Sequence, residues 1–385
     1  MTDASEGRTP PEERVAGSPS TVASTPRARL VRAWREGLPA PWDWLLGAAV
    51  VGYRAGLALH RAAYATGLRR TDTLPCAVVA VGNLTVGGTG KTPMVEWLAR
   101  ALRAGGRRVV VLSRGYGRRA ASPVTVVSDR DRVLATVEEA GDEPILLARR
   151  LPGVPVVVGS DRHQTGSAAL ERFGADVLVL DDGFQQQRLR ADVAVVCLDA
   201  QAPWGHRGLL PRGSLREPPR AIGRAHLLVL THPAGVTHRA AVEAEVRRHA
   251  GGVPIAHATY EPEGGVDART GAAVPLESLR GRPVLAFAGI AAPERFAATL
   301  RGLGTNLREL AVFPDHHAYR PADVTTLEAR ARAAGAAVLV TTEKDAVRLP
   351  PGGVLPVWAL PVRLRLEDPP AAWWALLERR LAASR

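Results

Sequence analysis

Lysine is nearly absent from this chain of 385 residues. Only Lys91 and Lys344 occur among its 50 basic residues, and all the others are arginine. Such a bias fills most positively charged positions with arginine, so a remaining lysine marks a place where a compact ammonium group is needed and a planar guanidinium is unsuitable. Both lysines are therefore candidates for function, with chance survival as the alternative for Lys344.

Cysteine and aromatic residues are also scarce. Cys76 and Cys197, the two cysteines, both lie in apolar stretches, and we interpret them as buried core thiols in a reducing compartment. Aromatic residues make up 5% of the chain, and no basic cluster is interleaved with them, which argues against nucleic acid. The formal net charge of +12 instead favours acidic partners: a nucleotide, a phosphorylated substrate or an anionic membrane surface. No obligate protein partner is inferred.

A long hydrophobic run is missing as well. The uncharged stretch Trp44–Tyr53 is far shorter than the roughly 20 residues that span a bilayer. From Trp42 to Arg70, large apolar residues repeat along one stripe of a helix, and Arg54 and Arg61 border it. We expect an interfacial helix, with Trp42 and Trp44 at headgroup depth, whereas the alternative is a helix packed on the following domain. The stripe consists of Leu46, Val50, Tyr53, Leu57, Tyr64 and Leu68.

The most informative stretch is an apolar strand at 76–81 followed by a glycine-rich loop that ends in Gly90, Lys91 and Thr92. A helix to 104 and another strand follow, so the unit is βαβ with a phosphate-binding loop at its first turn. Lys91 is expected to reach the β- and γ-phosphates, and Thr92 to bind Mg²⁺. Thr85 occupies the position where the motif usually has its first glycine. The alternative interpretation of the loop is a glycine-rich structural turn. The predicted nucleotide-binding residues are Thr85, Val86, Gly87, Gly88, Thr89, Gly90, Lys91 and Thr92.

Strands and helices alternate through the rest of the chain, which predicts an α/β fold that is P-loop NTPase-like, with a mostly parallel sheet flanked by helices. The expected strands are 76–81, 108–112, 124–128, 154–159, 176–181, 193–199, 225–231 and 253–258. A second, smaller α/β domain follows a Gly/Pro-rich boundary. The predicted division is a disordered extension at 1–28, an N-terminal membrane-interface helix region at 29–70, a P-loop kinase domain at 71–262 and a C-terminal α/β domain at 263–385. Residues 1–28 lack the apolar core of a signal peptide.

Carboxylates follow two of the predicted elements. Asp181 and Asp182 end an apolar strand, where an acidic residue beside a phosphate loop orients Mg²⁺; turn formation is the alternative. Only one of the two should reach the metal, because successive side chains of a strand point to opposite faces. Asp142 and Glu143 open a helix, where they either offset the helix dipole or serve as a general base and a metal-bound carboxylate.

Three further segments are candidates for substrate contacts or proton transfer. Arg114 and Arg118 follow a strand at the edge where open α/β sheets bind ligands, and both could grip an anionic group. His316 lies beside Asp315 in a predicted loop and could hold a proton, and a histidine-rich metal site is the weaker alternative. Residues 203–224 form a long irregular segment, which in a compact domain usually indicates a functional loop.

These motifs, taken in order, resemble those of the tetraacyldisaccharide 4′-kinase family, the lipid A 4′-kinases. The resemblance runs from about Trp42 to the C-terminus. It is carried by segments 82–93, 112–118, 141–144, 181–185, 209–218, 314–316 and 341–345. It implies phosphorylation, with ATP and Mg²⁺, of the 4′-hydroxyl of a tetraacyldisaccharide 1-phosphate to give lipid IVA, at the cytosolic face of the inner membrane.

The resemblance also implies roles for individual residues. Asp142 and His316 would form an acid–histidine pair that abstracts the proton, with Lys91 as the third catalytic residue. The implied metal ligands are Thr92, Glu143, Asp181 and Asp182, and the implied substrate residues are Asn83, Arg114, Tyr116, Arg118, Gln185 and Lys344. Gln186 stands where family members often carry histidine, so no proton-carrying role is assigned to it.

Two other functions remain open from the sequence. One is a P-loop ATPase that acts as a nucleotide switch for a protein partner, which would need no acceptor base. The other is a soluble small-molecule kinase, for which the Trp42–Arg70 helix would be structural.

Overall fold

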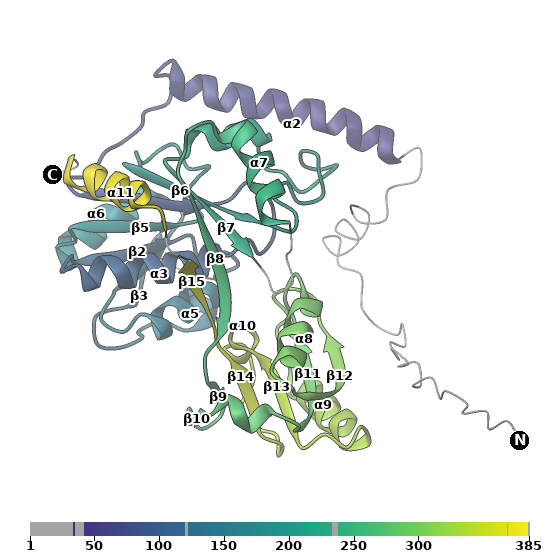
Figure 1. The fold of residues 1–385 in the computed structure, drawn as a ribbon. Helices are drawn as coiled ribbons and strands as arrows, with labels where there is room; N and C mark the ends of the chain where they lie inside the picture. The colour runs from purple at the N-terminus through teal and green to yellow at the C-terminus, as the bar shows by residue number, and fades with distance from the viewer. Residues whose placement is uncertain (1–33, 35–41, 120–121, 233–237, 368, 384–385) are drawn as a thin grey trace, which may run out of the picture.

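The computed structural model describes residues 34, 42–119, 122–232, 238–367 and 369–383. The predicted extension at 1–28 lies outside them, as does the side chain of Trp42. Figure 1 shows a larger domain, the helix α2 along one end of it, and a smaller domain at the opposite end.

The larger domain is built on a nine-stranded sheet in the order β15-β8-β7-β6-β1-β5-β2-β4-β3. Its strands are β1 (Ala77–Gly82), β2 (Val109–Ser113), β3 (Val124–Ser128), β4 (Val156–Gly159), β5 (Val177–Asp181), β6 (Val193–Asp199), β7 (Leu227–His232), β8 (Ile255–Pro262) and β15 (Val362–Glu367). Only the two outermost pairs, β3 with β4 and β15 with β8, are antiparallel. The eight strands predicted from the sequence are all present, and the mostly parallel α/β sheet is confirmed.

Helices cover both faces of this sheet, as apolar strands buried on two sides require. One face carries α3 (Lys91–Ala104), α5 (Asp142–Arg150) and α11 (Ala371–Ala383), together with the short α4 (Val137–Ala140). The other face carries α6 (Arg162–Phe173), α7 (Arg239–Ala250) and the 3-10 helix η1 (Pro219–Arg224). In β1, Val79 and Val81 join the first cluster while Val78 and Ala80 join another, as alternating side chains predict.

The smaller domain contains a six-stranded sheet in the order β10-β9-β14-β13-β11-β12. The strands are β9 (Gly265–Asp267), β10 (Ala273–Val274), β11 (Pro283–Ala288), β12 (Asn306–Val312), β13 (Val338–Thr342) and β14 (Val357–Leu360), and the helices are η2 (Leu276–Leu279), α8 (Pro293–Gly302), α9 (Pro321–Ala333) and α10 (Glu343–Ala346). Helices α8 and α9 pack on opposite faces of this sheet.

The end of the chain returns to the larger domain, which corrects the predicted domain of 263–385. Strand β15 pairs with β8, and Trp373 and Leu377 of α11 are fully buried in the same cluster as α3. Residues 362–383 therefore complete the nine-stranded sheet and its covering layer. The sequence placed them wrongly because a strand's local pattern does not specify which sheet edge it joins.

Helix α2 (Trp42–Ala65) packs on the irregular segment 203–224. Leu46, Val50, Tyr53 and Leu57, predicted to face a membrane, are half-buried, and the hydroxyl of Tyr53 donates to the carbonyl oxygen of Arg216 at 2.7 Å. This part of the stripe therefore faces protein and not outward as predicted, whereas Leu68 at the end of the stripe is 84% exposed. No helix among the described residues is long and apolar enough to cross a membrane.

Candidate active site

The phosphate loop links the carboxyl end of β1 to the N-terminus of α3. Lys91 is the first residue of α3, and no side chain caps the amides of its first turn, so they are available to an anion. Gly90 has a φ of 87°, and an added Cβ there would collide with the hydroxyl of Tyr260, so only glycine fits. The loop thus has the backbone of an anion-binding site.

Asn83 and Gln185, which were predicted to contact substrate, instead form hydrogen bonds that stabilise the phosphate loop. Asn83 is fully buried, and its Nδ2 donates to Oγ1 of Thr89 at 2.7 Å. Nε2 of Gln185 donates to the carbonyl oxygen of Asn83 at 2.8 Å. Both side chains therefore hold the shape of the loop, and the sequence could not separate this role from a substrate contact.

Asp181 and Asp182 end β5, which lies next to β1 in the sheet, and their environments differ. The buried carboxylate of Asp181 accepts a hydrogen bond from Oγ of Ser113 at 3.0 Å, and its Oδ1 has no hydrogen-bond partner. Burial and the nearby carboxylates of Glu143 and Asp182 raise the pKa of Asp181 to about 6. The charge of Lys91 acts against this rise, but burial and the two carboxylates outweigh it.

Asp182 has its counter-charges in place. Both of its carboxylate oxygens lie 2.8 Å from a guanidinium nitrogen of Arg216, and Oδ1 is 3.7 Å from Nζ of Lys91. Burial alone would raise the pKa of Asp182, but the charges of Lys91 and Arg216 prevail and lower it. Its φ of 53° turns the chain out of the strand and separates the directions of the two aspartates.

An Asp–His pair forms across the two domains. Asp142 begins α5 in the larger domain, and His316 lies in the loop after β12 in the smaller domain, with its Nδ1 2.9 Å from Oδ2 of Asp142. Burial opposes ionisation of Asp142, but the hydrogen bond with His316 and the charges of Lys344 and Arg348 lower its pKa to about 2. Asp142 is therefore a carboxylate at neutral pH.

Lys344 lies at the centre of the same group. It belongs to α10, directly after β13, and its Nζ is 3.2 Å from Nε2 of His316, 3.4 Å from Oδ1 of Asp315 and 3.5 Å from Oε1 of Glu143. The carboxylate of Asp142 can accept a hydrogen bond from Nδ1–H of His316, while the ammonium of Lys344 faces Nε2. The structure thus brings Lys344 to the Asp142–His316 pair.

Arg348 and Asp345 were not among the residues predicted to form the site. The buried guanidinium of Arg348 donates to Asp345 at 2.7 Å and to the carbonyl oxygens of Lys344 and His317, and its Nε lies 3.7 Å from Oδ2 of Asp142. Asp345, which is fully buried, also accepts from the hydroxyl of Tyr319. These two residues fix α10 against the His316 loop. In the sequence, their role was indicated by position: Asp345 ends the motif segment 341–345, and Arg348 lies just after it.

The predicted arginines after β2 separate. Arg118 donates to Oγ1 of Thr125 and to the carbonyl oxygen of Pro123, which holds it against β3. Arg114 and Tyr116 are exposed, and the backbone of Tyr116 lies beside Gly141, the residue before Asp142. The structure therefore leaves Arg114 and Tyr116 free to reach a ligand next to the Asp–His pair, while Arg118 is already bound within the protein.

The residues present fit a magnesium ion that is bound together with a nucleotide. Among the described residues, no three His, Cys, Asp or Glu side chains are grouped so that they could hold a metal alone. Mg²⁺ bound with a nucleotide takes one or two carboxylates, and phosphate oxygens and waters complete its ligands. The partnerless Oδ1 of Asp181 suits that arrangement.

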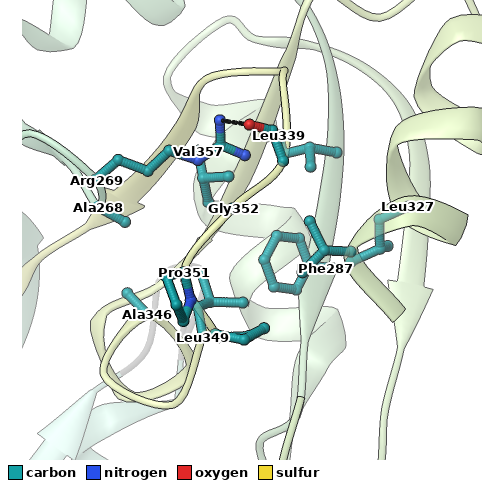
Figure 2. Close-up of a pocket in the computed structure, with 13 residues that line it drawn as sticks. Ala268, Arg269, Phe287, Leu327, Leu339, Ala346, Leu349, Pro351, Gly352 and Val357 are labelled. Carbon is teal, nitrogen blue, oxygen red and sulfur yellow. Dashed lines mark hydrogen bonds between the residues drawn. The ribbon is translucent and has the colours of Figure 1, made fainter. Parts of the chain in front are cut away.

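A cavity of about 490 Å³ lies away from these groups, inside the smaller domain (Figure 2). Its walls are mainly apolar, with Phe287, Leu327 and Leu349 around it and Arg269 at one side. It contains none of the predicted site residues, so the candidate site is the cluster that links the phosphate loop to the Asp142–His316 pair.

Comparison with known proteins identifies the group to which these features belong. Residues 42–382 match the family model described as LpxK, tetraacyldisaccharide-1-P 4′-kinase. A tetraacyldisaccharide 4′-kinase of Syntrophus aciditrophicus (strain SB) is 43% identical over 357 residues, which cover 89% of this chain and 95% of that protein. One of Anaeromyxobacter dehalogenans (strain 2CP-C) is 45% identical over 324 residues, 83% of this chain and 85% of its own.

A solved structure is similar over the same length. The crystal structure of the "apo" form of LpxK from Aquifex aeolicus in complex with ATP superposes with a TM-score of 0.69 at 33% identity, and covers 89% of this chain and 98% of that chain.

Proposed function

The chain belongs to the tetraacyldisaccharide-1-P 4′-kinase family, and from this we propose that it transfers the γ-phosphoryl group of ATP to the 4′-hydroxyl of a tetraacyldisaccharide 1-phosphate. The observation that carries the proposal is the contact of 2.9 Å between Asp142 and His316, two residues from different domains that would together serve as the acceptor base. A nucleotide switch has no need of such a pair, so this contact favours the kinase over that alternative.

The nucleotide would bind with its phosphates on the amides of the loop and of the first turn of α3. Lys91 neutralises charge on the transferred group, and it lies near Asp182 without a tight ion pair, at 3.7 Å. The relative from Aquifex aeolicus that shares this fold was crystallised with ATP, which supports the same ligand here. Thr85 and Val86, held by the 203–224 segment, form the start of the loop.

Thr92, Glu143 and the Asp181/Asp182 pair are the residues that would hold Mg²⁺, with Asp181 the better placed because one of its oxygens has no partner. When bound there, Mg²⁺ would supply positive charge that offsets the charge of the nucleotide phosphates. Burial and the neighbouring carboxylates make ionisation of Asp181 costly, so a cation bound beside it would lower its pKa. Such a cation would be bound more tightly as the pH rises through about 6.

At the acceptor, Asp142 would hydrogen-bond the attacking hydroxyl. Its pKa of about 2 makes it a weak base, which is acceptable because phosphoryl transfer passes through a loose transition state and the proton leaves late. His316 orients the carboxylate, and the proton is finally held by the Asp142–His316 pair. Lys344, 3.2 Å from His316, fixes the imidazole and adds positive charge where phosphate oxygens approach.

The acylated substrate implies contact with a membrane surface. The face of α2 that points away from the protein carries Trp44, Leu45, Val51 and Leu59, which are between 58% and 79% exposed. This face, opposite to the predicted stripe, would lie in the interface at the cytosolic side of the inner membrane. Arg54 is exposed on the same helix and can meet anionic headgroups, whereas Arg61 is paired with Glu217.

The test is direct transfer of radiolabelled phosphate from ATP to a tetraacyldisaccharide 1-phosphate in mixed detergent micelles. The expected product carries the label on the sugar and forms only with lipid present. ATP hydrolysis at the same rate with and without the lipid, with no labelled lipid, would overturn the proposal and favour a nucleotide switch. Labelling of water-soluble sugars in preference to the lipid would favour the small-molecule kinase.

A further inference from the structure

Residues 214–217, in the irregular segment, contact the phosphate loop through their backbone. The amide of Val86 donates to the carbonyl oxygen of Ser214 at 2.8 Å, and the amide of Arg216 donates to that of Leu84 at 2.7 Å. Thr85 and Leu215 form an antiparallel bridge between these bonds. The segment therefore runs as a short strand along the first half of the loop.

The side chain of Arg216 points to the phosphate site. One guanidinium nitrogen lies 2.8 Å from each oxygen of Asp182 and 3.4 Å from Oε1 of Gln185. Because Nζ of Lys91 is 3.7 Å from the same carboxylate, Arg216 and Lys91 compete for Asp182. A carboxylate that is already paired with a guanidinium leaves the ammonium group free for phosphate.

The other side of the segment is bound to α2. The hydroxyl of Tyr53 donates to the carbonyl oxygen of Arg216 itself at 2.7 Å. The next residue, Glu217, has a side chain that is only 1% exposed, and it pairs with Arg61 of α2 and with Arg224 of η1. Two consecutive residues thus connect α2 to a carboxylate of the phosphate site.

We propose that Arg216 is a positioning residue for phosphoryl transfer, which keeps Asp182 from pairing closely with Lys91, and that α2 sets the position of Arg216 through Tyr53. The inference rests on the proposed nucleotide site but not on the identity of the lipid. Its consequence is that a shift of α2, the element proposed to meet the membrane, changes the position of a charged group beside the phosphates. Loss of Arg216 lets Asp182 draw Lys91 toward itself and away from the nucleotide.

The first experiment compares Arg216→Gln with Arg216→Lys in the full-length protein. We expect Arg216→Gln to lower kcat by about 10- to 100-fold, the usual effect of losing a group that orients a ligand, while KM for the lipid stays within about threefold. Arg216→Lys should restore part of the loss because it returns a positive charge to Asp182. Wild-type kcat in folded Arg216→Gln, or equal defects in both variants, would overturn the positioning role.

A second readout does not depend on turnover. The rise in unfolding temperature on addition of Mg·ATP should be smaller in Arg216→Gln than in the wild type and intermediate in Arg216→Lys. An unchanged rise in Arg216→Gln contradicts the proposal. Circular dichroism and the unfolding temperature without nucleotide show that each variant is folded. If the wild type binds ATP but labels no lipid, the proposed function fails, and this readout still tests Arg216.

The second experiment tests the link to α2 with Tyr53→Phe. This substitution removes only the hydroxyl that donates a hydrogen bond to the carbonyl oxygen of Arg216. Tyr64→Phe is the matched control, since Tyr64 is a half-buried tyrosine on the same helix with a ring contact to His60. We expect a several-fold loss of kcat in Tyr53→Phe, none in Tyr64→Phe, and no further loss when Tyr53→Phe is added to Arg216→Gln. Wild-type kcat in Tyr53→Phe, or additive losses in the double variant, would overturn the link.

Discussion

At the scale of single residues, the site is defined by charges whose environments differ although their side chains are alike. Asp142 and Asp181 are both buried aspartates, yet the pKa of the first is lowered to about 2 and that of the second is raised to about 6. The difference follows from their neighbours: His316, Lys344 and Arg348 outweigh the burial of Asp142, whereas the burial of Asp181 and the carboxylates of Glu143 and Asp182 outweigh the charge of Lys91. Asp142 is therefore suited to accept a hydrogen bond, and Asp181 to accept a cation.

The Asp142–His316 pair gives the first prediction. Asp142→Asn and His316→Ala should each lower kcat for lipid phosphorylation by about 10²- to 10⁴-fold, the range for loss of acid–base catalysis, because the acceptor hydroxyl loses its base or the group that orients it. ATP binding, measured by thermal shift, should remain, whereas Lys91→Ala should lose both. Normal turnover in the two variants together with an inactive Lys91→Ala would contradict the mechanism.

The second prediction concerns the stability of the protein without ligands. A carboxyl group whose pKa is higher in the folded than in the unfolded state costs stability once it ionises, here as the pH rises from about 4 to 6. At pH 7, Asp181→Asn should therefore raise the unfolding temperature, and at pH 4 the gain should vanish.

Asp182→Asn is the matched control. Its pKa is lowered by Lys91 and Arg216, so the native ion pairs stabilise the fold at pH 7, and the substitution should lower the unfolding temperature. Urea or thermal unfolding at the two pH values checks both signs. A destabilised Asp181→Asn at pH 7 would mean that its carboxylate is better compensated than its contacts indicate.

The third prediction uses the scarcity of lysine. Lys344→Arg keeps the charge but replaces a compact group that sits among His316, Asp315 and Glu143 with a planar fork. We expect a loss of kcat with an unfolding temperature within about 2 °C of the wild type, since the substitution keeps the charge of a half-buried side chain and creates no cavity. Wild-type kinetics would show that Lys344 survived by chance.

At the scale of elements, α2 has two apolar faces with different partners. The half-buried face with Tyr53 lies on the irregular segment, and the exposed face with Trp44, Val51 and Leu59 carries no charge. A helix that packed only on protein would have a polar outer face. The outer face of α2 therefore supports a membrane surface as its partner.

The fourth prediction tests that face by flotation with anionic phospholipid vesicles. Val51→Asn combined with Leu59→Asn should reduce vesicle binding by at least about tenfold, because each buried aliphatic side chain contributes about 1.5–3 kcal/mol. Val354→Asn is the control, since Val354 is a valine in the smaller domain that is even more exposed than Val51, and this variant should float as the wild type does. Unchanged flotation of the double variant would exclude this face as the contact.

At the scale of the whole molecule, the chain crosses between the two domains twice. It leaves the nine-stranded sheet after β8 and returns at β15, so the smaller domain is inserted between two neighbouring strands of the larger one. A network of ion pairs connects the elements on the two sides of this crossing. Glu96 of α3 pairs with Arg150 and Arg363, and Arg150 also pairs with Glu343, the residue before Lys344. This network joins the phosphate-loop helix to α10 and orients the two halves of the site.

The fifth prediction follows from that return. Trp373 is fully buried although it lies 12 residues from the end of the chain, so Trp373→Ala should lower the free energy of unfolding of the larger domain by about 3–5 kcal/mol. Its neighbour Trp374 is only half-buried, and Trp374→Ala should cost clearly less. Denaturant unfolding of the two variants, with protection of the ATP site as the readout for the larger domain, measures the difference. Equal effects of Trp373→Ala and Trp374→Ala would mean that α11 is not part of this core.

Local sequence patterns determined most of the secondary structure and most of the motifs of this protein. The eight strands, the phosphate loop and the acidic strand end follow from apolar periodicity and from glycine positions, which act over a few residues and are readable without the fold. The two remaining lysines and the Asp142 and His316 motifs were likewise recognisable, as was the family.

Tertiary structure alone decided what those residues touch. Pairing of His316 with Asp142 spans 174 positions, β15 joins the edge left open by β8, and the predicted membrane stripe of α2 packs on the irregular segment instead. Asn83 and Arg118 were assigned to substrate by their motifs, yet their side chains are bound within the protein. The physical reason is common to all of these: hydrophobic burial and charge pairing are satisfied between distant segments, and a sequence pattern shows that a face needs a partner without showing which one.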